Sequence, residues 1–103
     1  MSETENPVKN NEAESQFEWT AGGQITVLTY RLEPGSIVFL HTGVPEELQG
    51  HGIAGKLAAA GLQFARQNGW TVIPLCPFVA GYLKNHQEYL DLVQKDYRGR
   101  VTR

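Results

Sequence analysis

The chain has 103 residues, of which 41% are hydrophobic and 19% charged, with a formal net charge of −2 at pH 7. This length suits one small domain and excludes large architectures such as the (β/α)₈ barrel, which needs roughly 250 residues. The sequence has no apolar run of about 18 residues that could span a membrane, and its single cysteine excludes an intrachain disulfide. We therefore expect a globular, cytoplasmic protein.

The N-terminal segment is polar and acidic. Residues 1–18 contain five glutamates and one lysine, unlike the basic and then apolar start of a signal peptide. Residues 1–15 offer little apolar surface to bury, so we expect a disordered tail there. The folded domain is expected over residues 16–94, followed by a polar C-terminal tail over residues 95–103.

Three strands are predicted after the tail. Residues 16–20 alternate between apolar and polar side chains, and residues 24–32 are rich in β-branched and aromatic types. Glycine-containing turns at 21–23 and 33–35 separate the strands. The third strand, residues 36–44, is apolar on both faces, which is typical of a central strand covered on both sides.

One convincing helix follows, over residues 50–68, with a stripe of small residues that would let its axis lie close to a sheet. Residues 70–75 then predict a short buried strand. Short helices are expected over residues 78–85 and 86–92. The order is an antiparallel meander followed by β-α-β-α, so the predicted fold class is α+β (mixed α/β), with a right-handed crossover.

The most informative segment, residues 44–57, joins the third strand to the main helix. A helix N-terminus presents unpaired N–H groups and a positive dipole end, and Gly50, Gly52 and Gly55 leave the backbone bare for phosphate oxygens. Residues 50–87 contain no Asp or Glu, so an anionic ligand would be tolerated. The surroundings fit neither the Rossmann nor the P-loop pattern, and a glycine-rich turn without a ligand is the alternative.

This segment also carries a family signature. Gln49-x-x-Gly52-x-Ala54 resembles the Q/R-x-x-G-x-G/A signature of the GNAT acetyltransferases, in which the loop holds the pyrophosphate of acetyl-CoA. The resemblance implies a minimal GNAT-like fold, with this cofactor loop between the third strand and the main helix. It also implies acetyl-CoA (or CoA) as the cofactor. The implied cofactor-binding residues are Thr42, Val44, Gln49, Gly50, His51, Gly52, Ile53, Ala54, Gly55 and Tyr82.

Further motifs resemble a compact, single-domain branch of that family, over residues 17–93. His41-Thr42-x-Val44-Pro45 precedes the loop, and Pro74-x-Cys76-Pro77 follows the last strand, with Tyr82 and His86-x-x-Tyr89 beyond it. The chain departs from larger GNAT enzymes because it has no length for the N-terminal strand and helices that help build their acceptor site. Cys76-Pro77 also stands where those enzymes commonly have an asparagine.

Two residues are candidates for catalysis. Most free cysteines are small buried hydrophobes, but at a helix N-terminus the thiolate of Cys76 would be stabilised and could accept the acyl group. Alternation places His41 on the strand face of Ile37 and Phe39, where a core histidine is usual. In a catalytic role, His41 would be a general base that takes a proton from an amine.

The remaining candidates stay open. His51 supports the loop backbone or contacts a phosphate, and His86 contacts the cofactor or caps a helix. Tyr82 is either a packed aromatic or, as in many GNAT enzymes, the group that protonates the departing CoA thiolate. Three histidines this dispersed, with one cysteine, give no metal-ligand spacing.

The predicted function is therefore an acetyl-CoA-binding N-acetyltransferase acting on an unidentified amine, with the N–H near Val44 polarising the acyl carbonyl by analogy with the family. The alternative from another class is a non-catalytic CoA-binding or protein-interaction module on a truncated scaffold. A third is a loop that binds some other phosphate-bearing ligand. We expect no nucleic-acid or membrane partner, and a monomer or weak dimer.

Overall fold

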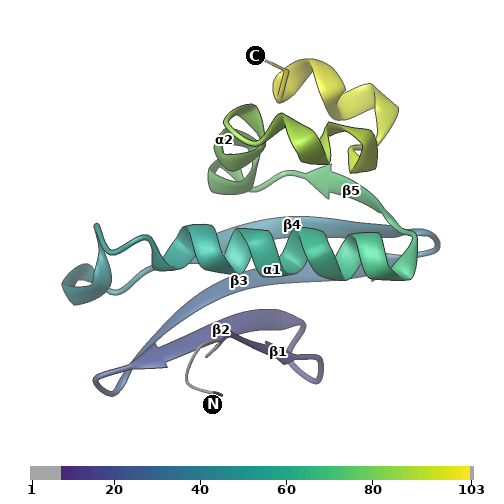
Figure 1. The fold of residues 1–103 in the computed structure, drawn as a ribbon. Helices are drawn as coiled ribbons and strands as arrows, with labels where there is room; N and C mark the ends of the chain where they lie inside the picture. Colours follow the sequence, from purple (N-terminus) through teal and green to yellow (C-terminus); the bar gives the residue numbers. More distant parts are fainter. Residues whose placement is uncertain (1–7, 103) are drawn as a thin grey trace.

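The structure, a computed structural model, describes residues 8–102. One sheet has the strand order β1-β2-β3-β4-β5, in which the first four strands are antiparallel and β5 runs parallel to β4 (Figure 1). The strands are β1 (Lys9–Asn11), β2 (Gln16–Ala21), β3 (Gln24–Glu33), β4 (Ser36–Gly43) and β5 (Thr71–Pro74). The helices are η2 (Glu46–Leu48), α1 (Ile53–Asn68), α2 (Pro77–Lys84), η3 (Gln87–Leu92) and η4 (Lys95–Arg100), with the η helices of the 3-10 type. The predicted α+β class is confirmed.

Helix α1 lies across β3 and β4, while α2 and η3 lie beside β5 (Figure 1). On the α1 side of the sheet, Phe17, Leu28 and Phe39 are buried in the main hydrophobic core. A Cβ atom on Gly61 would lie 2.8 Å from Cε1 of Phe39, closer than real Cβ contacts allow. The glycine therefore lets the helix axis approach the sheet, as the small-residue stripe predicted. No helix within residues 8–102 is long and apolar enough to cross a membrane.

The opposite face of the sheet, here called the open face, carries Ile25, Val27, Leu40 and His41, none of which belongs to the main core. Ile25 is 45% exposed and Leu40 is 37% exposed. A patch of apolar side chains on this side therefore remains in contact with solvent.

A β-bulge in β4 corrects the predicted orientation of His41. Tyr30 pairs with Phe39 and Thr29 pairs with His41, so Leu40 is an extra residue without a partner on β3. The strict alternation assumed from the sequence fails at this point. His41 consequently lies on the open face, exposed, and not on the face of Phe39.

Both ends of the described chain are more ordered than the sequence predicted. β1 pairs with β2, and the hydroxyl of Tyr30 donates a hydrogen bond to Oδ1 of Asn10 at 2.7 Å. The disordered tail is therefore corrected for residues 8–15, because backbone pairing orders a polar segment at a sheet edge. Its remainder, residues 1–7, lies outside the described residues.

The C-terminal segment forms η4, and Val101 after it is fully buried in the core. Gln87 donates a hydrogen bond from Nε2 to the carbonyl oxygen of Val101 at 2.9 Å. The expected polar tail over residues 95–103 is thus corrected up to residue 102, because Val101 is buried and Tyr97 packs against the core.

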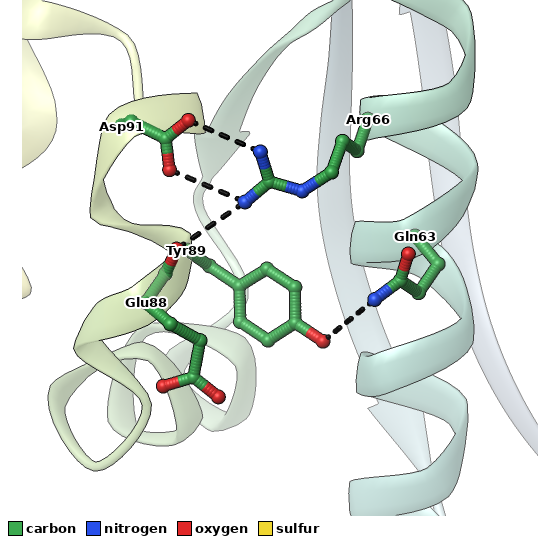
Figure 2. Close-up of polar contacts among 5 residues, drawn as sticks. All are labelled: Gln63, Arg66, Glu88, Tyr89 and Asp91. Carbon is green, nitrogen blue, oxygen red and sulfur yellow. Dashed lines mark hydrogen bonds and ion pairs between the residues drawn. The ribbon is translucent and has the colours of Figure 1, made fainter.

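The second half of α1 is fastened to η3 (Figure 2). Arg66 donates two hydrogen bonds to the carboxylate of Asp91, both at 3.2 Å, and a third to the carbonyl oxygen of Glu88 at 3.2 Å. Gln63 donates to the hydroxyl of Tyr89 at 3.1 Å. The hydrogen bonds from Arg66 lower the pKa of the Asp91 carboxyl, so the pair stays ionised at neutral pH.

Candidate functional site

The site begins at the loop between β4 and α1. Gly52 is the N-cap residue of α1 and has a left-handed backbone with φ of 77°, as does Gly50 with φ of 84°. Among the described residues no side chain caps this helix end, and its first turn contains no acidic residue. The first N–H groups of a helix have no intrahelical partner, so this turn offers several donors to an anion.

A hollow of about 220 Å³ lies over this turn. Its lining residues are Val44, Leu48, Gln49, Gly50, Gly52, Ile53, Ala54, Gly55 and Phe78. Gln49 also donates from Nε2 to the carbonyl oxygen of Val44 at 3.4 Å, which links the two ends of the loop. Since none of the lining residues is charged, no carboxylate would repel a phosphate there.

Seven of the ten predicted cofactor residues line this hollow: Val44, Gln49, Gly50, Gly52, Ile53, Ala54 and Gly55. His51 is exposed in the loop and is not among them. A larger hollow of about 570 Å³ lies between α1 and the first strands of the sheet, where Trp19, Lys56 and Phe64 are among its lining residues. It contains none of the predicted site residues, so size alone does not identify the site.

Thr42 and Cys76 meet where β4 and β5 stop pairing. The ladder between these strands ends at Phe39 and Pro74, and the backbone N–H of Cys76 donates to the carbonyl oxygen of Phe39 at 2.9 Å. Beyond this point, Oγ1 of Thr42 lies 3.1 Å from Sγ of Cys76, within hydrogen-bond distance. The thiol is 1% exposed and belongs to the N-cap residue of α2.

His41 does not join this pair. Its ring lies on the open face, close to Gly43 and Val27. A Cβ atom built on Gly43 would be 3.6 Å from Nε2 of His41 and 3.5 Å from Cγ2 of Val27. Thr42, the next residue, points to the other side and reaches Cys76. The two predicted catalytic residues are therefore separated by the sheet.

Tyr82 lies beside the loop, on α2. A Cβ on Gly55 would be 3.7 Å from Cε1 of Tyr82, so the edge of this ring lies close to the first turn of α1 at Gly55. The Tyr82 ring stacks on His86 with centroids 3.8 Å apart and an angle of 9° between the planes. Burial raises the pKa of Tyr82, so its hydroxyl stays protonated at neutral pH.

A third hollow, of about 350 Å³, adjoins these rings and is lined by Pro77, Phe78, Gly81, Tyr82, Asn85 and His86. Phe78 also lines the hollow over the loop, so it connects the two spaces. The sequence did not single out Phe78 because an apolar residue in a short amphipathic helix predicts core. Its 41% exposure is what distinguishes it from a core residue.

Comparisons with known proteins agree with this architecture. A model of the GCN5-related N-acetyltransferase family matches residues 16–92. The chain is similar to a GCN5-like protein from Staphylococcus aureus solved by NMR in solution, with 30% identity, a TM-score of 0.68, and coverage of 86% of this chain and 89% of that one. A search of curated proteins gives no match. The minimal GNAT-like fold expected from the motifs is confirmed, and the chain belongs to the GCN5-related N-acetyltransferase family of acyltransferases.

Proposed function

We propose that this protein binds acetyl-CoA at the glycine loop and transfers the acetyl group to an amine. The observation that carries the proposal is the first turn of α1, which no side chain within residues 8–102 caps and which faces an uncharged hollow. Acetyl-CoA would supply an acetyl group activated as a thioester. Localisation to the cytoplasm and a monomer or weak dimer remain part of the proposal.

The chain's own residues fit the phosphate end of such a ligand. Gly50 and Gly52 have left-handed backbones with nothing within 4 Å of a would-be Cβ, so ligand atoms can approach the main chain closely. The N–H groups of the first turn, together with the helix dipole, stabilise negative charge. The absence of Asp and Glu over residues 50–87 removes competing charge from this part of the sequence.

The Cys76 thiol and the His41 imidazole would act in two different routes of acetyl transfer. In a covalent route, the Cys76 thiol would attack the acetyl carbonyl and give up its proton to the departing sulfur, so that CoA leaves as a thiol. The amine would then displace the cysteine sulfur from the acetyl group, and Cys76 would take up the amine's proton. In a direct route, the amine attacks the thioester itself and a base removes its proton. His41 suits that role for an amine arriving over the open face, since its ring is exposed there.

Calorimetry with acetyl-CoA and with CoA tests the binding step. Both compounds should bind and stabilise the fold, by about 2.7 kcal/mol at a hundred times the dissociation constant. Gly52→Asp should abolish binding by adding a side chain and a negative charge. The matched control is Gly69→Asp at the other end of α1, where φ is 70° and the space is equally open. Absence of binding of either compound to the unmodified protein at millimolar concentration would overturn the proposal.

Kinetics with acetyl-CoA and Nα-blocked lysine test the transfer step. The covalent route predicts an acetyl adduct on Cys76 by mass spectrometry, and a sharp loss of kcat in Cys76→Ser with cofactor affinity retained. The direct route predicts no adduct, normal turnover in Cys76→Ser and slow turnover in His41→Gln. Tight cofactor binding without turnover toward any primary amine would favour the non-catalytic module.

A further inference from the structure

We propose that Phe78, Tyr82 and His86, which we call the aromatic ledge, bind the nucleotide base of acetyl-CoA. This inference rests on the proposed function and deepens it, because it assigns the part of the ligand that the protein uses to discriminate among thioesters. A thioester that ends at phosphopantetheine would reach the glycine loop but not the ledge.

Two rings of the ledge, those of Tyr82 and His86, are held in a fixed orientation relative to each other. Nδ1 of His86 lies 2.8 Å from the carbonyl oxygen of Tyr82, and the two rings stack nearly parallel. Because a carbonyl oxygen only accepts hydrogen bonds, this contact requires a proton on Nδ1, and Nε2 is an acceptor in the tautomer with that single proton. A preordered aromatic surface binds a planar base with little loss of side-chain entropy.

The ledge also lies at the correct place for a ligand already held at the loop. Phe78 lines both hollows, and the edge of the Tyr82 ring lies close to the turn at Gly55. At about 350 Å³, the hollow beside the ledge is within the usual range for small-molecule sites of roughly 300–1,000 Å³. Gly81 leaves it unfilled, since a Cβ there would meet nothing within 4 Å.

The chemistry of the lining favours a base over the other parts of the ligand. An adenine ring offers a flat π face for stacking and an amino group that can donate to an acceptor such as Nε2 of His86. Phe78, 41% exposed, presents a ring to solvent directly beside the phosphate loop. The pantetheine arm, which is flexible and aliphatic, would gain little from stacked rings.

Calorimetry with CoA and with 4′-phosphopantetheine tests the assignment. His86→Leu changes the ledge outside the loop hollow. It should weaken CoA binding about 5- to 100-fold, the usual effect of losing one base-stacking ring, and leave phosphopantetheine binding within about twofold. Phe78→Leu and Tyr82→Leu should also weaken CoA binding. Tyr97→Leu removes an aromatic on η4, outside both hollows, and is the matched control. Equal weakening of CoA binding and phosphopantetheine binding, or no weakening of either, would overturn the assignment.

Titration with ADP separates this inference from the proposed function. ADP should shift the NMR signals of Phe78, Tyr82 and His86, and Phe78→Leu should weaken its binding as it weakens that of CoA. Absence of those shifts would overturn the ledge assignment even if acetyl-CoA binds at the loop. Failure of the unmodified protein to bind acetyl-CoA is a separate result and would overturn the proposed function.

Discussion

The two ends of α1 are built in opposite ways. At the C-terminal end, Gly69 closes the helix with a backbone hydrogen bond to the carbonyl of Arg66, and Arg66 is itself bound to η3 (Figure 2). At the N-terminal end, Gly52 provides no side-chain cap and the first turn faces a hollow. The helix is fastened at one end and presents its backbone at the other, so stability and ligand binding should respond to different substitutions.

The largest effect is expected from Tyr89→Ala at the fastened end. Tyr89 is 8% exposed, accepts the hydrogen bond of Gln63 and lies against the guanidinium of Arg66. Removing a buried aromatic ring costs about 3–5 kcal/mol, a large part of the stability of a domain this size. Tyr89→Phe should lose only about 0.5–1.5 kcal/mol, measured by urea unfolding. A weaker CoA affinity in Tyr89→Phe would contradict the separation of the two ends.

Gly61→Val is expected to affect both ends together. The added side chain would overlap Phe39, since even a Cβ lies 2.8 Å from Cε1 of that ring. Overpacking of this kind costs about 1–3 kcal/mol, and it would lift α1 from the sheet along its length. The melting temperature, measured by thermal unfolding, and the CoA affinity, measured by calorimetry, should both fall. Normal CoA affinity in this variant would show that the loop tolerates movement of the helix.

Gly55→Ala should raise the stability of the fold and lower its affinity for CoA. The new methyl group would make only an ordinary contact, 3.7 Å from Cε1 of Tyr82, and alanine is favoured over glycine within a helix by about 0.5–1 kcal/mol. The same methyl group would take up space beside the hollow that Gly55 lines, so CoA affinity should fall. A rise in melting temperature with unchanged affinity would place the ligand elsewhere.

The smallest effect on stability is expected when acid protonates Asp91, the partner of Arg66 at the C-terminal end of α1. Hydrogen bonds from Arg66 lower the pKa of Asp91 below its ordinary value of 3.8, so the pair stabilises the fold above that pH. The contribution is lost as the pH falls through the lowered pKa. Asp91→Asn should therefore lower the melting temperature slightly at pH 7 and not at all near pH 2. The side chains of Arg66 and Asp91 are 42% and 64% exposed, so 1 M salt should reduce the difference. A difference that persists near pH 2 would show that another interaction is responsible.

The main elements could be predicted because their signals are local. Glycine and proline turns separate the strands, the small-residue stripe marks α1, and Gly50, Gly52 and Gly55 identify the loop. These residues act through the backbone conformations that glycine and proline favour, so their identity alone is enough to predict the turns.

The features that could not be predicted depend on tertiary context. A bulge has no fixed residue signature, so the orientation of His41 was wrong. The pairing of β1 depends on hydrogen bonds to a distant strand. Tyr82 and His86 were candidates from the sequence, but the exposure of Phe78 depends on which side of α2 faces solvent, and eight residues of helix leave that ambiguous.

The extra residue at Leu40 has a consequence for how reagents meet on this protein. It shifts the phase of β4 by one position, so that Thr42, and not His41, comes within 3.1 Å of the thiol. His41 and Thr42, which are adjacent in sequence, therefore face opposite sides of β4. Under the proposed function, a thioester at the Cys76 thiol and an amine at the His41 imidazole would approach this strand from opposite sides.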